Sequence, residues 1–390
     1  MRVDVLIFGG GASGLWCLDR FRRAGYATIL LESQALGAGQ TIKAQGIIHG
    51  GGKYALRGVR DFAAVRATSE MPELWRRCLS GASEPSLADV QVLSQRCYLW
   101  FPRGSVMAKA QAWGFMSIVS RAGLLASRPV KVDKEEWPET LRRSAASIYA
   151  LSEQVISTGS FLKTLAALHE NHIFLPEAAK VSIKNRRVEI GDETVEPRAI
   201  VLTAGSGNAE LLRRAGVGGD LMQRRPLKMV LLRGPLPPFY GHCVIGGKTQ
   251  LTITAPAPGL WQVGGELAEC LAREENREVA MQQARRALKR WIPGIDLAKL
   301  ELALYDAVRA EARTSDLRRP SGVHASYVTS GIVAAWPTKL CLAPVLADEV
   351  FRLVSAELKS PAGLNDPLPS WPKPSLAPYP WEDAEWCNAA

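Results

Sequence analysis

Three glycines near the start of the chain have the spacing of a phosphate-binding turn. Gly9, Gly11 and Gly14 follow the apolar run 3–8 and open an amphipathic segment that continues to residue 24. The first glycine permits a tight turn, the second lets the backbone approach a pyrophosphate, and the third allows a helix to pack closely on a strand. The positive end of that helix favours negative charge. The predicted chemistry is therefore the binding of a dinucleotide.

An acidic residue stands where such a turn requires one. The next apolar run, 27–31, ends at Glu32, eighteen residues after Gly14, where a carboxylate can accept hydrogen bonds from a ribose. The glycine spacing alone would be weak evidence, but here the strand, turn, helix, strand and acid occur in order. No second turn of this kind is present, because GSGNAE lacks the third glycine and GVGGD lacks the spacing. A separate nicotinamide-nucleotide domain is not predicted.

A second glycine-rich stretch, QGIIHGGGKY at 45–54, contains a histidine. Glycines let the backbone lie close to a ligand or to another segment. His49 belongs to the residue type most readily used as a base near neutral pH, and catalysis and anchoring of the loop are equally open roles. Lys53 and Tyr54 are neighbours, so only one of them can share a strand face with His49, and Tyr54 is the preferred pocket residue.

Composition limits the class of protein. With 390 residues and 47% apolar content the chain can form two or three folding units. The net charge of +10 indicates a solvated basic surface or an anionic ligand; dispersed basic residues with little aromatic interleaving do not favour nucleic acid. Seven cysteines without a CxxC pair indicate neither a zinc site nor a disulfide framework, and a cytoplasmic location is expected. No export signal and no run of about 18 apolar residues is seen.

Several blocks of the sequence resemble, in order, the FAD-dependent amine and hydroxyacid oxidoreductases, the family of D-amino-acid oxidase, glycine oxidase and sarcosine oxidase. IIHGGGKY is most similar to a segment of FAD-dependent glycerol-3-phosphate dehydrogenases and of L-2-hydroxyglutarate dehydrogenases. PRAIVLTAGSGNAELL resembles the family's second glycine turn, GLWQVGGELAE a substrate-domain strand, and GIVAAWPTKLCLAPVLADEV the closing strand, turn and helix. The blocks cover about half of the chain.

The resemblance implies a noncovalently bound FAD and an enzyme that removes a hydride from a carbon bearing OH or NH. The expected substrate is small and anionic: a hydroxy acid, an amino acid or a polyol phosphate. The substrate would reduce the flavin, and oxygen, a quinone or a protein would reoxidise it. The implied cofactor-binding residues are Gly9, Gly11, Ala12, Ser13, Gly14, Glu32, Ser33, Gln40, Thr41, Gln45, Gly46, Val181, Ala204, Gly205, Lys339 and Leu340.

Two further residues receive catalytic roles from the resemblance, beside His49 and Tyr54. Lys339 in WPTKL is the candidate for a positive charge near N1 and the C2 carbonyl of the flavin, although Trp and Pro replace the family's glycine pair in this turn. Arg309 is the candidate for holding the anionic group of the substrate, since a guanidinium binds carboxylate or phosphate through two hydrogen bonds. A solvated lysine and a structural bridge from Arg309 to Glu311 are the alternatives. Competing arginines are Arg313, Arg318 and Arg319.

The predicted fold class is α/β, with a Rossmann-like FAD-binding domain and a discontinuous antiparallel-sheet substrate domain of α+β type. The FAD-binding domain would comprise 1–80, 150–225 and 305–360, and the substrate domain 81–149 and 226–304, with a hairpin near 181–190. Residues 361–390 hold seven prolines and three tryptophans and are expected to lie extended on the surface or to contact a membrane surface or a second copy.

Two other functions stay open at this point. One is a flavoprotein that acts on a larger lipid, natural-product or nucleic-acid substrate, which the less similar substrate domain permits. The other is a non-catalytic binding protein with an FAD fold, against which the intact glycines and Glu32 argue.

Overall fold

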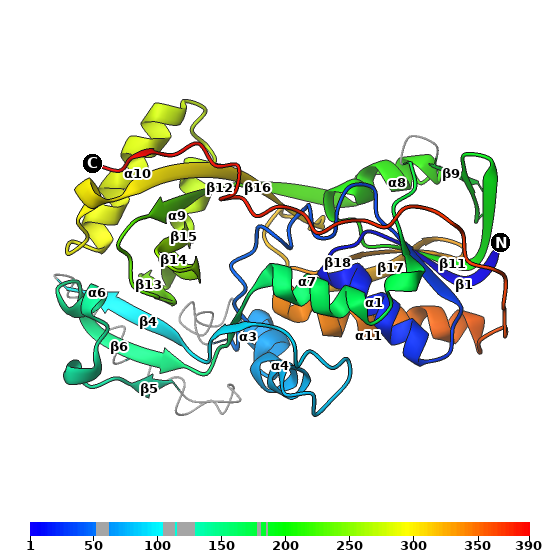
Figure 1. Cartoon of the computed structure of the whole chain (residues 1–390), viewed down its shortest axis with the longest axis horizontal. Helices are drawn as coiled ribbons and strands as arrows, with labels where there is room; N and C mark the ends of the chain where they lie inside the picture. The colour runs from blue at the N-terminus through cyan, green and yellow to red at the C-terminus, as the bar shows by residue number, and fades with distance from the viewer. Residues whose placement is uncertain (52–61, 104–113, 115–128, 178–180, 185) are drawn as a thin grey trace.

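A computed structural model shows two lobes connected by two long strands, β12 (Met222–Arg233) and β16 (Glu301–Ala312) (Figure 1). The structure describes residues 1–51, 62–103, 114, 129–177, 181–184 and 186–390. One lobe contains a mainly parallel sheet with helices on it, and the other an antiparallel sheet. Among the described helices, none combines the length and the apolar character needed to cross a membrane.

The first sheet has the strand order β17-β18-β11-β1-β2-β8, with the hairpin of β9 and β10 attached to β11. Neighbours are parallel except at the edge strand β17. Both faces of β1 and β18 are covered, which explains why, beyond Asp4 in β1, their buried residues are apolar. The strands are β1 (Arg2–Phe8), β2 (Thr28–Leu31), β8 (Ile173–Phe174), β9 (Val181–Lys184), β10 (Arg187–Ile190), β11 (Glu193–Leu202), β17 (His324–Thr329) and β18 (Ile332–Trp336).

Helices cover one face of this sheet, while the β9–β10 hairpin and α8 lie on the other. Leu15 and Leu18 of α1 pack with Leu346 and Val350 of α11 in one apolar core. The hairpin contributes to a second core on the opposite face, and its antiparallel pairing confirms the predicted hairpin. The helices of this lobe are α1 (Ala12–Arg23), α3 (Phe62–Thr68), α4 (Met71–Leu79), α7 (Thr158–Ala167), α8 (Asn208–Arg214) and α11 (Ala343–Leu358).

The second sheet has the order β19-β16-β12-β15-β14-β13-β4-β6-β5 and is largely antiparallel, so the predicted fold class is confirmed. Strand β16 pairs along its whole length with β12, which places 305–312 in this sheet rather than in the nucleotide-binding lobe. Its other strands are β4 (Cys97–Pro102), β5 (Val130–Lys131), β6 (Ala145–Leu151), β13 (Gly241–Ile245), β14 (Lys248–Ala257), β15 (Leu260–Gly264) and β19 (Cys387–Asn388); its helices are α6 (Glu139–Arg142), α9 (Glu266–Leu271) and α10 (Arg277–Trp291). A separate short pair is β3 (Val92–Ser94) with β7 (Val155–Ile156).

Residues 361–390 run as an extended strap across both lobes (Figure 1). Leu376 forms a bridge to Leu36, and the Tyr379 hydroxyl accepts a hydrogen bond of 3.0 Å from the Gly159 amide. At its end the strap adds β19 to the edge of the second sheet. A paired edge exposes fewer unsatisfied backbone groups, so the strap protects that edge. The proposed contact of the strap with a partner stays a prediction.

Replacing Asp4 by alanine is expected to loosen the strap and destabilise the first sheet. The buried Asp4 carboxylate accepts hydrogen bonds from the amides of Ala27 (2.9 Å) and Ala362 (3.1 Å) and from the Arg198 guanidinium (2.7 Å). Its loss leaves these donors unsatisfied, which lowers the free energy of unfolding by about 2 kcal/mol. Urea unfolding measures the change. Asp366→Ala is the control: its carboxylate is only partly buried and accepts from the Arg2 amide at the edge of the molecule (2.8 Å), so its removal should have a smaller effect.

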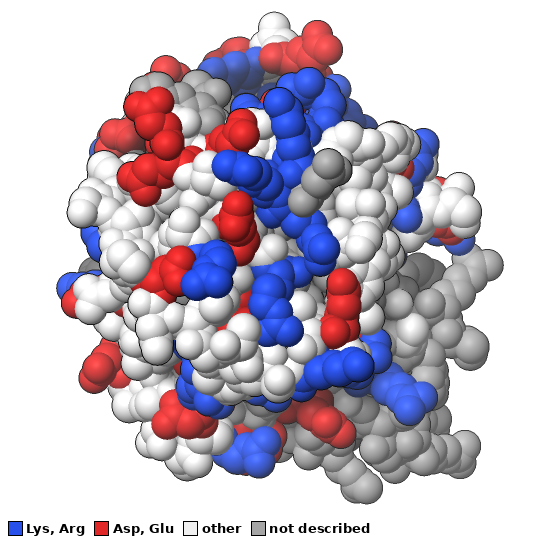
Figure 2. Space-filling model, turned by 90° about the vertical axis from the view of Figure 1, so that its right-hand side faces the viewer, with Lys and Arg blue, Asp and Glu red and all other residues white. Residues whose placement is uncertain are grey.

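The positive charge of the chain is not gathered into one continuous field on the face that ends the first lobe. Figure 2 shows Lys and Arg in several groups there, with Asp and Glu between them. Because opposite charges lie close together on this face, their electric fields largely cancel farther from the surface.

Candidate active site

The glycine turn connects β1 to α1 and lies against the end of β11. Gly9 has φ +106°, and a Cβ on it would lie 2.6 Å from the Cα of Ala204. A Cβ on Gly14 would lie 1.8 Å from the Gly9 carbonyl oxygen. Gly11 precedes the helix in an extended conformation, and the first turn of α1 holds no acidic residue. The turn therefore presents a helix N-terminus suited to a phosphate group.

Glu32 lies beside this turn, at the carboxyl end of β2. Its Oε2 accepts a hydrogen bond from the Gly10 amide, and its Oε1 accepts from the amides of Ser33 and Gln34 at 2.8 and 3.0 Å. A carboxylate has about four acceptor positions, so one remains for a ribose hydroxyl. Glycine turn and acid are thus adjacent in space, as a dinucleotide requires.

The segment that follows Glu32 connects the two lobes. The Thr41 hydroxyl accepts a hydrogen bond from the Ala12 amide at the start of α1 (3.1 Å). The Gln40 Oε1 accepts one from the Ala310 amide of β16 (3.1 Å). Ser13, in the first helical turn, is buried. One short stretch is therefore fixed both to the phosphate-binding turn and to the second sheet.

Gln45 and Gly46 continue this connection. The Gln45 amide nitrogen donates to the carbonyl oxygens of Thr252 and Gln262, each at 2.9 Å, where β14 and β15 pair irregularly. Gly46 has φ +69°, and a Cβ on it would lie 2.0 Å from the Ile156 carbonyl oxygen. The glycine is needed because two chain segments come into backbone contact here.

The end of β11 is fixed by a residue that the sequence analysis did not select. Asn208 accepts a hydrogen bond from the Ala204 amide (2.8 Å) and donates to the carbonyls of Leu202 (3.1 Å) and Ala335 (3.3 Å). Gly205 follows in a left-handed conformation, with φ +57°. Asn208 thus ties β11 to β18 directly beside the glycine turn.

The remaining cofactor candidates lie on two sides of the first sheet. Lys339, 7% exposed, follows β18 and donates from Nζ to the Ser321 carbonyl at 3.1 Å. Leu340 begins the single 3-10 turn that leads into α11. Val181 begins β9, and its carbonyl accepts a hydrogen bond from Arg214 at 2.9 Å.

His49 faces a buried carboxylate, that of Glu153. The His49 Nδ1 lies 3.3 Å from the Glu153 Oε2, and the Gly50 amide donates to the other oxygen at 2.8 Å. His242 on β13 approaches the same Oε2 through Nε2, at 3.9 Å. Burial alone raises the pKa of Glu153, but hydrogen bonds and charge from His242 and His49 hold it well below its usual range. These contacts favour the ionised form of the carboxylate.

One face of the second sheet carries polar groups where a buried sheet would normally be apolar. By the alternation of strand side chains, His242, Thr252 and Gln262 share a face on neighbouring strands with Tyr305. Tyr305 donates to the Lys43 carbonyl at 3.2 Å and contacts Gln262, which also donates to that carbonyl. This face therefore lies against the 40–45 segment.

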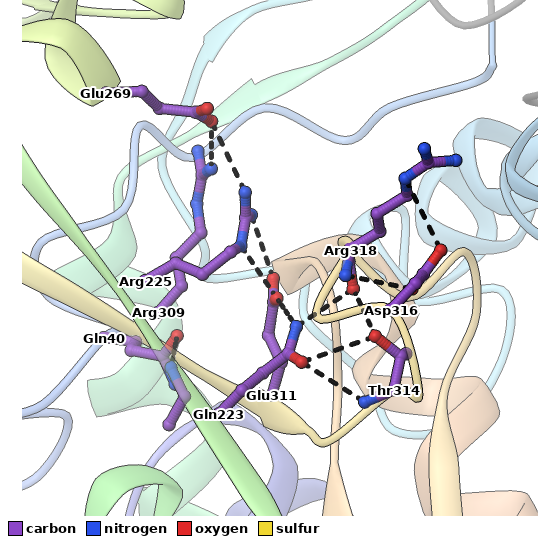
Figure 3. A network of polar contacts seen from close by, with 10 residues as sticks. Gln40, Gln223, Arg225, Glu269, Arg309, Glu311, Thr314, Asp316 and Arg318 are labelled. Carbon is purple, nitrogen blue, oxygen red and sulfur yellow. Dashed lines mark hydrogen bonds and ion pairs between the residues drawn. The ribbon is translucent and has the colours of Figure 1, made fainter.

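Further along the same face lies a cluster of arginines and glutamates (Figure 3). Arg225 on β12 and Arg309 on β16 are directly opposite in the strand register. Glu269 of α9 lies 2.9 Å from Arg309 and 3.7 Å from Arg225, and Glu311 accepts from the Arg225 Nε at 2.9 Å. Arg309 therefore pairs with Glu269. The structural bridge from Arg309 to Glu311, offered above as the alternative to a substrate contact, is replaced by a pair of Arg225 with Glu311.

The positive charges of this arginine cluster act on one another and on Glu269. Burial together with the charges of Arg319 and Arg225 lowers the pKa of Arg309 to about 10, despite Glu269. Burial raises the pKa of Glu269, but Arg309 and Arg225 lower it on balance. Guanidinium groups placed this closely suit an anion.

Sequence reasoning missed Glu153, His242, Arg225 and Gln262. Arg225 stands in the basic run QRRPLK, but nothing local distinguishes it from its neighbours. His242 and Gln262 reach the site through strand pairing, and Glu153 through the segment that follows β6. One polar side-chain atom from each of His49, Glu153 and His242 lies within 4.8 Å of the other two. Tyr54, with Lys53, lies outside the described residues.

The glycine turn with Glu32 defines a dinucleotide-binding flavoprotein fold, and the polar face of the second sheet lies against the 40–45 segment of this fold. The chain matches the family model for FAD-dependent oxidoreductases (DAO) over residues 4–343. It is 37% identical over 398 aligned positions to the FAD-dependent oxidoreductase PA4991 of Pseudomonas aeruginosa, covering 98% of each chain. This protein therefore belongs to the DAO family of FAD-dependent oxidoreductases, and it is an enzyme with FAD as its cofactor.

Solved structures agree with this assignment. The crystal structure of PA4991 superimposes with a TM-score of 0.81 at 33% identity, with 98% of each chain covered. Glycine oxidase of Geobacillus kaustophilus gives a TM-score of 0.64 at 15% identity, covering 93% of this chain and 96% of its own. The FAD-bound L-alpha-glycerophosphate oxidase of Mycoplasma pneumoniae gives 0.66 at 17%, covering 91% and 95%. The last two show similarity of fold alone.

Proposed function

We propose that this enzyme removes a hydride from a carbon bearing OH or NH in a small anionic substrate, such as a hydroxy acid, an amino acid or a polyol phosphate. The observation that carries the proposal is the cross-strand pair Arg225 and Arg309, on the same sheet face as the residues that contact the 40–45 segment. Paired guanidinium groups suit carboxylate or phosphate. Glycine carries a carboxylate and glycerophosphate a phosphate, which are the substrates in the names of two structural neighbours.

The residues at the glycine turn fit FAD. The positive φ of Gly9 and the helix start at Gly11 provide the turn for the pyrophosphate, and Glu32 has an acceptor position for the ribose. The turns at Gly205 and Lys339 follow the neighbouring parallel strands β11 and β18. The Lys339 ammonium would supply positive charge near N1 and the C2 carbonyl of the flavin ring. FAD supplies the acceptor for the two electrons of the hydride.

The chain's own residues have three tasks in the reaction. Arg225 and Arg309 hold the anionic group, which fixes the orientation of the carbon that is oxidised. His49 takes the proton of the OH or NH as the C–H bond breaks, so that a C=O or C=N bond forms. The proton would end on the imidazole; FAD would accept the hydride, and oxygen, a quinone or a protein would serve as the final electron acceptor. Tyr54 is a proposed pocket residue beside His49.

Anaerobic bleaching of the flavin tests this function. The purified protein is mixed without oxygen with 2-hydroxy acids, amino acids and glycerol phosphate, and with the matched neutral amides and glycerol. We expect flavin absorbance that one anionic compound bleaches, and at least about 100-fold weaker bleaching by its neutral partner, since a charged hydrogen-bonded contact contributes about 3 kcal/mol.

Two outcomes would contradict the proposal. Equal bleaching by the neutral partner would remove the role of the arginine pair. A flavin that no compound of the panel bleaches, with bleaching instead by a larger lipid or natural product, would favour the larger-substrate function.

A further inference from the structure

Three separate chain segments bring their polar groups together at Glu153. The carboxylate follows β6, His49 lies on the glycine-rich stretch after the 40–45 segment, and His242 lies on β13 of the second sheet. Glu153 is 2% exposed and His242 is fully buried. The two imidazole rings are 5.6 Å apart. A charged group buried to this degree requires partners of opposite charge or good donors.

The two carboxylate oxygens have different partners. Oε1 accepts the Gly50 amide at 2.8 Å, which fixes the carboxylate to the backbone next to His49. Oε2 faces the His49 Nδ1 at 3.3 Å. An ionised carboxylate only accepts hydrogen bonds, so the proton of a neutral His49 must be on Nδ1, and Nε2 keeps its lone pair.

His242 is held on the other side of Oε2. Its Nδ1 lies 3.0 Å from the Thr252 hydroxyl on the neighbouring strand, and its Nε2 lies 3.9 Å from Oε2. Thr252 also offers its carbonyl to Gln45. The second sheet thus orients His242, whose Nε2 flanks the carboxylate beyond hydrogen-bond distance.

We propose that Glu153, oriented by the Gly50 amide, is the positioning residue of His49: it fixes the His49 ring with the proton on Nδ1, so that Nε2 is the nitrogen that takes the proton of the substrate. The inference deepens the proposed function and rests on it. After proton transfer His49 is an imidazolium, and the carboxylate beside it stabilises that charge. The proton moves from the substrate OH or NH to Nε2, and Glu153 itself stays ionised.

A comparison within the chain separates this role from a purely structural one. Asp4 is equally buried, but its partners are two amides and an arginine, none of which exchanges a proton near neutral pH. Glu153 instead faces two imidazoles, one of them on the second sheet. Among the described contacts of His49, those with Glu153 and His242 join it to titratable groups.

The direct test follows the titration of His49 in the FAD-loaded protein by NMR with labelled histidine. The chain has five histidines, and loss of one signal in His49→Asn assigns it. Glu153→Gln is expected to lower the His49 pKa by about 1 unit or more, since the nearby negative charge favours the imidazolium. Asp19→Asn is the matched control: it removes a buried carboxylate that lies 3.1 Å from another histidine, His169, and should leave the His49 titration unchanged.

The second readout is the pH dependence of flavin reduction by the substrate that bleaches it. In Glu153→Gln the maximal rate should fall by about 100-fold, within the range of general base catalysis, and the midpoint of its rise should move to lower pH. Glu153→Asp, which keeps the charge, should recover part of the rate. FAD content and thermal stability are measured for each variant, because loss of structure alone would lower the rate without moving the midpoint.

The two proposals fail in different ways. If no compound of the panel reduces the wild-type flavin, the proposed function fails, while the His49 titration still reports on Glu153. An unchanged His49 titration in Glu153→Gln would overturn the positioning role. So would a stoichiometric divalent metal in the purified protein that Glu153→Gln loses, since it would occupy the imidazole nitrogens.

Discussion

Gly14→Ala is expected to yield a protein that binds no FAD and unfolds more easily. A Cβ at this position would lie 1.8 Å from the Gly9 carbonyl oxygen and 2.8 Å from the Thr203 hydroxyl. Alanine in a helix normally stabilises it by up to about 1 kcal/mol relative to glycine. Overpacking against the backbone costs about 3 kcal/mol, so the net change is a loss of about 2 kcal/mol. Relieving the contact must move α1 away from β1, and the phosphate-binding turn moves with it.

Gly11→Ala is the matched variant and should separate binding from folding. Gly11 is extended, with φ −84°, and its added Cβ would meet the Thr41 hydroxyl at 3.2 Å, a contact that a small shift relieves. The free energy of unfolding of the apoprotein should change by less than about 0.5 kcal/mol. FAD affinity should still fall at least about tenfold, because the methyl group occupies the approach to the pyrophosphate. Gly11→Leu should abolish binding.

Urea unfolding of the apoproteins and titration with FAD measure both variants. Equal stability of Gly14→Ala and wild type would show that the close helix-to-strand contact is absent in solution. Full FAD binding by Gly11→Leu would remove Gly11 from the cofactor site.

The nucleotide-binding lobe could be predicted because its requirements are local. The turn needs glycines at Gly9, Gly11 and Gly14, and the acid follows within the same strand–helix–strand unit, so the whole signal lies in one short stretch. The assignment of β11 and β18 to this lobe followed from the resemblance rather than from periodicity, and their order beside β1 is given only by the structure. The strand β16 was divided between two lobes because no break in its sequence marks where its pairing with β12 begins.

The candidate active site could be predicted only in part, because its residues meet through contacts between segments that are far apart in sequence. His49 was visible from its glycine-rich surroundings, but Glu153 is 104 residues away and His242 lies on a third segment. Arg309 was selected, yet its neighbour Arg225 depends on the register of two strands that are far apart in sequence. A single sequence does not fix such a register, since shifting a strand by one residue turns every side chain to the other face.

Arg309→Met should weaken binding of the anionic substrate about 100-fold while the rate of flavin reduction at saturation changes little. Arg309 faces the inner side of the second sheet, and its removal leaves Arg225 alone to pair with the anion. Loss of a charged hydrogen-bonded contact costs about 3 kcal/mol, which corresponds to this factor. Arg225→Met should behave similarly, and the double variant should lose less than the product of the two, because both act on one group.

Arg233→Met is the control for charge. It lies on the same strand β12 but pairs with exposed Glu301 at 2.7 Å at the other end, so substrate affinity should stay within about twofold of wild type. Stopped-flow reduction over a range of substrate concentrations separates affinity from rate. If Arg233→Met and Arg309→Met weaken binding equally, the effect is one of net charge and the cluster is not the anion site.

The arginine cluster should also be less favourable for stability than for binding. Like charges directly opposite on antiparallel strands destabilise a sheet, and Arg225 and Arg309 occupy such positions. Glu269 offsets part of this repulsion, but Arg319 adds to it. Arg309→Met should therefore change the stability of the substrate-free protein by less than about 1 kcal/mol, although an ion pair is lost. A site that gains little from its own charges and much from an anion is arranged to bind one.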